Sequence, residues 1–210
     1  MIYQKEREAV AATMRRLYSQ GLTTCSGGNI SLRVGKNHVL ITPSALDKGK
    51  TNFRQIALMT LDGENYSTGL KPSIETDMHL KILKCRPDIN AVVHAHPKSA
   101  SYLTAVQNGV IRTDLLAEAR YLLGEPAFAP YALMGTESLG DTAAASLADG
   151  QFALLMENHG VLTVGKTLLQ AFDRIEVLEA AAEMTVNALT SGNISPLCET
   201  KLKEIDGLHS

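Results

Sequence analysis

The sequence lacks the cysteine patterns that define disulfide-rich and thiolate-metal proteins. It has three cysteines in 210 residues, and Cys25, Cys85 and Cys198 are far apart and form no Cys-x-x-Cys pair. An odd number of widely spaced cysteines argues against a disulfide framework and against zinc held by thiolates. The chain start also lacks the pattern of a signal peptide. We therefore expect reduced thiols and a cytoplasmic protein.

Neither charge nor hydrophobicity is concentrated in one part of the chain. The 20 Lys and Arg residues against 22 Asp and Glu residues give a formal net charge of −2, with no basic surplus for nucleic acid. No apolar run approaches the roughly 20 residues that cross a membrane. With 45% apolar residues and no internal repeat or low-complexity linker, the chain can bury one core. We expect a single domain over residues 1–210, ending in a tail at 190–210, and neither nucleic acid nor a membrane as partner.

Helical patterns and short strand patterns alternate irregularly along the chain. Helices are predicted at 6–20, 73–83, 100–107, 115–123, 138–147 and 168–189, and strands at 30–34, 38–42, 56–61, 89–96, 152–156 and 161–164. Ser73 is the predicted N-cap of the second helix, with Glu75 and Asp77 in its first turn. Strict βαβ units are absent, and no Gly-x-Gly-x-x-Gly follows the first strand, so a Rossmann fold is not favoured. The pattern predicts an α/β domain with a mixed, largely antiparallel sheet and helices on both faces.

Three histidines are the clearest chemical signal in the sequence. His94 and His96 lie in an apolar stretch with strand character, where residues i and i+2 point to the same face. His159 follows a second apolar stretch. Three imidazole nitrogens with a fourth position left open are typical of catalytic zinc, which polarises an oxygen-bearing substrate.

Five motifs occur in a defined order along the chain. They are Ser26-Gly27-Gly28-Asn29-Ile30-Ser31, Ile41-Thr42-Pro43-Ser44, Lys71-Pro72-Ser73-x-Glu75, Ala91-Val92-Val93-His94-Ala95-His96 and Asn158-His159-Gly160. Together they resemble the class II aldolase/adducin family, and the resemblance extends from the first helix to about Leu189.

The resemblance implies a three-layer α/β/α fold and a zinc ion held by His94, His96 and His159. It implies that Glu75 ligates the metal at rest and acts as acid and base during turnover. A phosphate pocket is implied as well, and its residues are Gly28, Asn29, Ser44, Ala45 and Ser73. In this family the active sites lie between subunits of a homotetramer.

Simple chemistry agrees with the activity that the resemblance implies, the cleavage of a ketose phosphate such as L-fuculose 1-phosphate to dihydroxyacetone phosphate and an aldehyde. Breaking the C3–C4 bond leaves a carbanion beside a ketone, and a metal ion can stabilise that charge. The reaction also needs a base for the C4 hydroxyl proton and an acid for the carbanion, and Glu75 can serve near the metal. Backbone N–H groups of a Gly-rich turn and a helix start at Ser73 can bind phosphate without a basic patch.

Three departures from the family pattern concern the substrate more than the metal. Ile74 stands where sugar-phosphate aldolases usually carry a second Ser, and Ala45 stands where Gly is common. Lys48 could compensate as a point charge, or it could be a solvated loop lysine. No residue matches the Tyr that bacterial fuculose-phosphate enzymes use as an inter-subunit proton donor.

Several alternatives remain open on the sequence alone. Another lyase on the same scaffold is the second interpretation, either a methylthioribulose-1-phosphate dehydratase or a sugar-acid phosphate decarboxylase. A 4-epimerase is less favoured, because the epimerases carry Asp where this chain has Glu75. A non-catalytic, adducin-like interaction module should have lost its ligands first. Among single residues, His79 is interpreted as a structural support rather than a ligand, and Cys25 as a buried small residue rather than a nucleophile.

Overall fold

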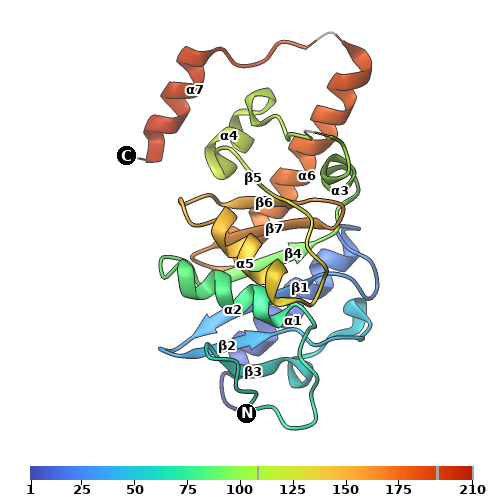
Figure 1. Cartoon of the computed structure of the whole chain (residues 1–210), viewed down its shortest axis with the longest axis vertical. Helices are drawn as coiled ribbons and strands as arrows, with labels where there is room; N and C mark the ends of the chain where they lie inside the picture. The colour runs from blue at the N-terminus through green and yellow to red at the C-terminus, as the bar shows by residue number, and fades with distance from the viewer. Residues whose placement is uncertain (108, 193, 210) are drawn as a thin grey trace.

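A computed structural model describes residues 1–107, 109–192 and 194–209 of the chain (Figure 1). Its centre is a seven-stranded sheet in the order β3-β2-β1-β4-β7-β6-β5. The strands are β1 (Asn29–Val34), β2 (His38–Ile41), β3 (Ala57–Thr60), β4 (Ala91–Ala95), β5 (Ala127–Ala129), β6 (Ala153–Met156) and β7 (Gly160–Gly165). Every neighbouring pair is antiparallel except β5 and β6, which are parallel. The prediction of a mixed, largely antiparallel sheet is confirmed.

Helices cover both faces of the sheet and complete three layers (Figure 1). One face packs against α1 (Gln4–Ser19), α3 (Lys98–Thr104), α4 (Ala117–Leu123) and α6 (Leu168–Ser191), and the other against α2 (Thr76–Cys85) and α5 (Glu137–Ser146). The described residues also form four short 3-10 helices, η1 (Lys48–Lys50), η2 (Phe53–Gln55), η3 (Thr113–Leu115) and η4 (Gly207–His209). Near the C-terminus, α7 (Glu199–Asp206) contacts α4. The α/β/α layering agrees with the resemblance.

Strand β4 shows how the sheet separates the two cores. Ala91, Val93 and Ala95 join the core beneath α1, α3 and α6, whereas Val92 joins the core beneath α2 and α5. Side chains alternate along a strand, so His94 lies on the same face as Val92. The histidine is fully buried on the α2 side of the sheet.

The predicted start of the second helix is wrong. Helix α2 begins at Thr76 with Glu75 as its N-cap residue, and its first backbone bond runs from the His79 N–H to the Glu75 carbonyl. Ser73 precedes the helix in a turn that is closed by the Thr76 N–H on the Ser73 carbonyl. Its hydroxyl accepts a hydrogen bond from the Asn29 side chain at 2.9 Å, so it serves the loop around the cavity described below.

Two other local predictions also fail. Strand β5 has no counterpart in the prediction, because three residues are too few for an alternating pattern to stand out. Cys25 is exposed rather than buried, as are Cys85 and Cys198. The inward contact of Cys25 is made by its carbonyl oxygen, which accepts the Lys48 N–H at 2.8 Å.

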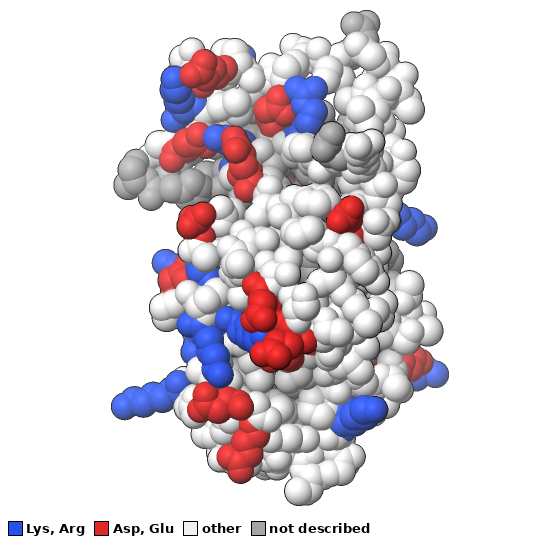
Figure 2. Space-filling view, in the orientation of Figure 1, with Lys and Arg blue, Asp and Glu red and all other residues white. Residues whose placement is uncertain are grey.

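The surface carries charges of both signs. On the face drawn in Figure 2, Lys and Arg are interspersed with Asp and Glu. Lys81 pairs with Asp77, Glu137 and Asp141 and so links α2 to α5. None of the helices in the described part of the chain carries an apolar stretch long enough to cross a membrane.

Candidate active site

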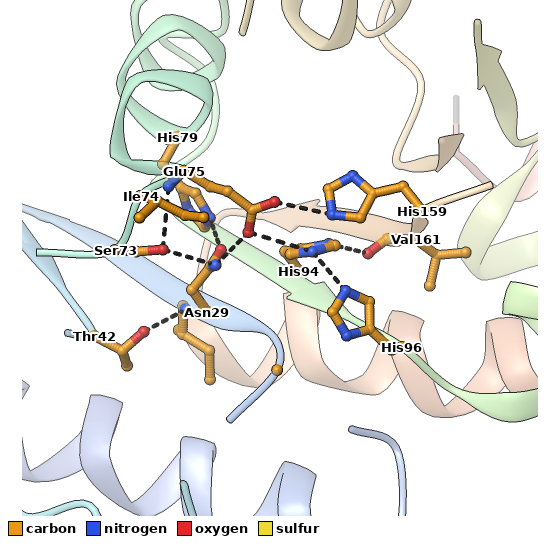
Figure 3. A network of polar contacts seen from close by, with 12 residues as sticks. Asn29, Thr42, Ser73, Ile74, Glu75, His79, His94, His96, His159 and Val161 are labelled. Atoms are coloured by element: carbon orange, nitrogen blue, oxygen red, sulfur yellow. Dashed lines mark hydrogen bonds and ion pairs between the residues drawn. The ribbon is translucent and has the colours of Figure 1, made fainter. Parts of the chain in front are cut away.

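Four side chains with ligand chemistry converge at one end of strand β4 (Figure 3). His94 is on β4, His96 follows the strand directly, and His159 lies in the turn between β6 and β7. Glu75 reaches the same point from the start of α2. The fold thus brings together three histidines and a carboxylate, although more than 80 residues separate Glu75 from His159 in the sequence.

The distances among these groups are short. Nε2 of His94 lies 3.0 Å from Nε2 of His96, and one ring nitrogen from each of the three histidines falls within 4.8 Å of the others. The carboxylate spans two of them, with Oε1 of Glu75 2.9 Å from Nε2 of His159 and Oε2 3.5 Å from Nε2 of His94. The three histidine nitrogens therefore face a common point, and the Glu75 carboxylate contacts two of these histidines.

The backbone fixes which nitrogen of His94 is available. Nδ1 of His94 lies 2.9 Å from the carbonyl oxygen of Val161 on β7. A carbonyl oxygen only accepts, so Nδ1 carries the proton and Nε2 keeps its lone pair directed at the cluster. Metal-binding histidines commonly donate their second N–H to such a group.

Two buried polar atoms in the cluster make no hydrogen bond. They are Oε1 of Glu75, whose contact with His159 lacks hydrogen-bond geometry, and Nδ1 of His159. Buried polar atoms are almost always satisfied, and exceptions mark places where an ion, water or ligand supplies the partner. The donor set and the orphaned oxygen fit a divalent metal ion of the zinc type.

A chain of hydrogen bonds holds the Glu75 carboxylate in place. Nδ2 of Asn29 donates to Oε2 of Glu75 at 2.6 Å. Oδ1 of Asn29 accepts from Nε2 of His79, and Nδ1 of His79 accepts from the Ser31 hydroxyl at 2.7 Å. The prediction that His79 is structural agrees with this position, because it connects α2 to β1 one layer behind Glu75.

Burial and neighbouring charges tune the protonation of the cluster. Burial raises the pKa of the Glu75 carboxyl, but His94, His159 and Asn29 favour the carboxylate, and the net effect is a pKa well below the usual range. Burial lowers the pKa of His94, and burial together with the neighbouring histidines lowers the pKa of His96 to about 3. At neutral pH Glu75 is therefore anionic, and His94 and His96 are neutral imidazoles with lone pairs for a metal.

A cavity of about 490 Å³ opens above the cluster. Its wall includes all five residues that the resemblance assigns to a phosphate pocket, namely Gly28, Asn29, Ser44, Ala45 and Ser73. The two hydroxyls differ in what they can offer a ligand. Ser44 donates to the Pro72 carbonyl and accepts from the Ile74 N–H, whereas Ser73 accepts from Asn29 and Glu75 and keeps its own proton to donate.

The backbone at two cavity residues adopts the left-handed conformation. Gly28 has φ +67°, and a Cβ there would lie 2.7 Å from the His94 carbonyl oxygen, so only glycine fits. Ala45 has φ +54°, a region that costs a residue with a Cβ roughly 1–2 kcal/mol. A glycine would adopt this conformation without that cost, which agrees with the expectation that glycine is common at this position.

The sequence leaves the surroundings of Lys48 open, and the structure resolves them. Lys48 is 2% exposed and lines the cavity, so it is not a solvated loop lysine. The bonding of Asn29 to Glu75 is also absent from the sequence prediction, which places Asn29 only in the phosphate pocket. No local sequence signal points to this bond, because it depends on the strand register that pairs Asn29 on β1 with His94 on β4.

The chain is similar to known proteins over most of its length. The family model described as Class II Aldolase and Adducin N-terminal domain matches residues 8–186. A 5-deoxy-D-ribulose 1-phosphate aldolase from Bacillus thuringiensis serovar kurstaki is 33% identical, over 98% of this chain and 95% of its own length. A 3-oxo-tetronate 4-phosphate decarboxylase from Haemophilus influenzae is 28% identical, over 96% of each chain. A solved structure of L-fuculose 1-phosphate aldolase superposes with a TM-score of 0.90 at 27% identity, covering 100% of this chain and 98% of the other.

Proposed function

The chain belongs to the class II aldolase and adducin family and is a lyase, and from this premise we propose that it is a zinc-dependent aldolase. Its substrate would be a ketose phosphate, L-fuculose 1-phosphate or a close relative, cleaved to dihydroxyacetone phosphate and an aldehyde. One observation carries the proposal: three histidine nitrogens converge beside the Glu75 carboxylate, next to a cavity whose wall includes Gly28, Ser44 and Ser73.

In this proposal His94, His96, His159 and, at rest, Glu75 hold the metal ion. When bound, the ion supplies Lewis-acid stabilisation for the negative charge that develops on substrate oxygens. His94 and His96 are neutral imidazoles at pH 7 and Glu75 is a carboxylate, and these donors together with His159 fit a divalent ion of the zinc type.

Glu75 is the proton carrier in this proposal. Its carboxylate is ionised at neutral pH and can accept the C4 hydroxyl proton as the C3–C4 bond breaks. The same group, once protonated, can return the proton to the carbanion at C3. Asn29 holds Oε2 by a 2.6 Å hydrogen bond, so the carboxyl group stays aimed at the cavity between these two transfers.

The phosphate group would bind where donors are free. The Ser73 hydroxyl has a proton to give, and the backbone of the Gly28 turn approaches the cavity without a side chain in the way. These groups lie beside Glu75, so a phosphate at one end of a short ketose would leave its carbon chain over the histidine cluster.

The similarity to the Haemophilus influenzae protein supports a second candidate, a decarboxylase of a sugar-acid phosphate. Decarboxylation would use the same metal-stabilised carbanion but would release carbon dioxide rather than an aldehyde. The two candidates therefore differ in their products and not in their metal site.

Product analysis tests the proposal. The zinc-loaded protein would be incubated with L-fuculose 1-phosphate, 5-deoxy-D-ribulose 1-phosphate and 3-oxo-tetronate 4-phosphate, with triose phosphate and carbon dioxide measured in parallel. Triose phosphate that appears from a ketose 1-phosphate and disappears with a chelator is expected. Carbon dioxide from the sugar acid with no triose phosphate from either ketose would establish the second candidate and overturn the first.

We further infer that the protein is a homotetramer with active sites between subunits. Two large apolar side chains at the cavity, Ile74 and Met134, are 54% and 56% exposed, and the nearby Leu133 is 58% exposed. Such exposed apolar groups are typical of a surface that another subunit covers. Light scattering coupled to size-exclusion chromatography should give four times the 22.6 kDa chain mass, and a monomer would contradict the inference.

A cytoplasmic location is inferred from the cysteines. All three are free and exposed, and exposed free thiols persist in reducing compartments.

A further inference from the structure

Lys48 is a buried cation that forms no ion pair with any carboxylate in the described part of the chain. The side chain is 2% exposed and lines the cavity above the histidine cluster. Nζ donates one hydrogen bond, to the Pro43 carbonyl oxygen at 2.9 Å. An ammonium group has three protons, so two donors remain for another partner.

The nearest acidic groups are already engaged elsewhere. Oδ2 of Asp47 lies 3.6 Å from Nζ of the exposed Lys50, and Oδ1 of Asp47 accepts a hydrogen bond from the Gly49 N–H. Glu75 attracts Lys48 at longer range but is bound by Asn29 and by the histidines. Across residues 1–107, 109–192 and 194–209, no carboxylate lies within the 4 Å of an ion pair with Lys48.

Burying a charge without a partner is costly, and lysine is almost never fully buried unless it is paired. Burial lowers the pKa of Lys48 to about 8, opposed by the charge of Glu75, so the group is still an ammonium at pH 7. The folded protein therefore maintains a positive charge at the cavity wall at a cost to its own stability.

The position of this charge is fixed by the backbone around it. The Lys48 N–H is bonded to the Cys25 carbonyl oxygen in the loop that precedes Gly28. The next residue, Gly49, packs so closely on the Tyr18 ring of α1 that a Cβ there would lie 2.7 Å from it. The backbone that carries Lys48 is thus anchored to α1 and to the Gly-rich loop, and the residue lines the same cavity as Gly28 and Ser73.

We propose that Lys48 is the fixed positive charge that pairs with the phosphate group of the substrate and makes the cavity selective for phosphorylated substrates. The proposal rests on the proposed function for the identity of the substrate, but not for the presence of an anion site. A phosphate monoester is a dianion with three acceptor oxygens, and the two unused Lys48 protons and the Ser73 hydroxyl provide donors for it.

The competing explanation is that Lys48 serves only the loop, through its hydrogen bond to Pro43. Two substitutions separate this explanation from the proposal. Lys48→Met keeps the length of the side chain and removes both charge and donor, whereas Lys48→Gln removes the charge but keeps an N–H for the Pro43 carbonyl. Lys50→Met is the matched control, because Lys50 lies in the same 3-10 helix with its side chain 86% exposed.

The experiment measures thermal stability of the zinc-loaded proteins against increasing inorganic phosphate. Wild type and Lys50→Met should be stabilised by phosphate with the same half-saturating concentration. In Lys48→Met and Lys48→Gln that concentration should rise about tenfold or more, because one partner of a buried charge pair is gone. Zinc content should stay the same in all four proteins, since Lys48 is outside the metal cluster.

Three results would overturn the proposal. Phosphate stabilisation that is unchanged in both Lys48 variants would show that Lys48 does not bind phosphate and serves only the loop. Loss of phosphate stabilisation in Lys48→Met but not in Lys48→Gln would lead to the same conclusion. Acetate that stabilises wild type as well as phosphate, with the same dependence on Lys48, would make the site one for carboxylates. If Lys48→Met fails to fold, Lys48→Gln still decides between charge and loop support, because it keeps an N–H for the Pro43 carbonyl oxygen.

Kinetics on the substrate complete the test. For the ketose phosphate that the wild type cleaves, both Lys48 variants should raise KM about tenfold or more and change kcat less. A protein that binds phosphate through Lys48 but releases no triose phosphate would refute the aldolase proposal and leave this one intact. Normal cleavage with an unchanged KM in both variants would refute this one alone.

Discussion

Glu75 has two proposed roles, as the group that transfers protons and as a metal ligand at rest. Its charge is stabilised by His94, His159 and Asn29, which outweigh the effect of burial on its pKa. Glu75→Gln keeps the side-chain shape and removes the basic oxygen. We expect the variant to bind zinc and to lose about 10²-fold in kcat, as for other general acid–base residues. Zinc per subunit and steady-state rates measure both quantities.

The control for this variant is Glu137→Gln on α5, where the carboxylate is 85% exposed and pairs with Lys81 on the surface. It should retain wild-type kcat. A Glu75→Gln protein that matches this control in kcat would assign proton transfer to another group.

The buried ammonium of Lys48 also predicts a dependence of stability on pH. The pKa of this group falls from 10.5 in the unfolded chain to about 8 in the folded protein. Between these values the unfolded chain binds more protons, so the folded state gains stability as pH rises through the window, by up to about 3 kcal/mol. Below pH 8 the full cost is present. The negative charge of Glu75 reduces that cost but does not cancel it.

Urea unfolding of wild type and Lys48→Met at pH 7 and pH 10 tests this dependence. At pH 7 the Met variant should be as stable as wild type or more stable, by about 1–3 kcal/mol. At pH 10 the difference should shrink. A Met variant that is markedly less stable at both values would mean that the Pro43 hydrogen bond outweighs the burial of the charge.

At the scale of elements, the site depends on how closely the β6–β7 turn approaches the end of β4. Gly160 begins β7 where a side chain has no room, since a Cβ would lie 2.8 Å from the Ala95 carbonyl oxygen and would overlap the ring of His96. We expect Gly160→Ala to displace His96, weaken zinc binding roughly 10–100-fold and cost about 1–3 kcal/mol in stability. Zinc titration and urea unfolding measure these effects.

Gly207→Ala is the control for the glycine substitution, because a Cβ at Gly207 would meet no atom within 4 Å. It should leave zinc affinity and stability unchanged. Wild-type zinc affinity in Gly160→Ala would show that the turn can yield without moving His96.

The elements that sequence alone predicts well are those with a long, regular pattern. The hairpin of β1 and β2, the buried strand β4 and the long helix α6 have clear periodicity, and all three are confirmed. The start of α2 is harder to predict. Ser73 has the side chain of a typical N-cap residue, but its hydroxyl accepts a hydrogen bond from the Asn29 side chain instead of capping the helix. Strand β5 could not be predicted, because its short parallel pairing with β6 is a tertiary contact.

The same distinction applies to the site. The spacing of His94 and His96 predicts that two imidazoles share a face, and the structure places them 3.0 Å apart. The link from Ser31 through His79 and Asn29 to Glu75 has no signal in local sequence. It requires the register of β1 against β4 and the packing of α2 on the sheet, and neither can be read from spacing.

Across the molecule, the predicted metal centre draws its ligands from three separate segments, and each segment is already packed in the hydrophobic cores. His94 and His96 belong to β4, His159 to the β6–β7 turn and Glu75 to the start of α2, yet the buried apolar side chains form clusters on both faces of the sheet without them. Zinc should therefore add stability to a protein that already folds without it. This behaviour differs from that of small zinc domains, which unfold when the metal is removed.

Chelation measures the contribution of the metal to the whole fold. A ligand that binds only the folded state stabilises it by about 2.7 kcal/mol at 100 times its dissociation constant, which for a chain of this size corresponds to roughly 5–10 °C in Tm. We expect chelated wild type to melt cooperatively at a Tm lower by about that amount, and zinc to restore it. His96→Ala should melt at one temperature with and without zinc, because two imidazoles and a carboxylate hold the ion far less tightly than the full set.

An equal response to zinc in His96→Ala and wild type would show that the ion binds elsewhere, and the absence of any response in wild type would contradict a metal centre at this end of β4.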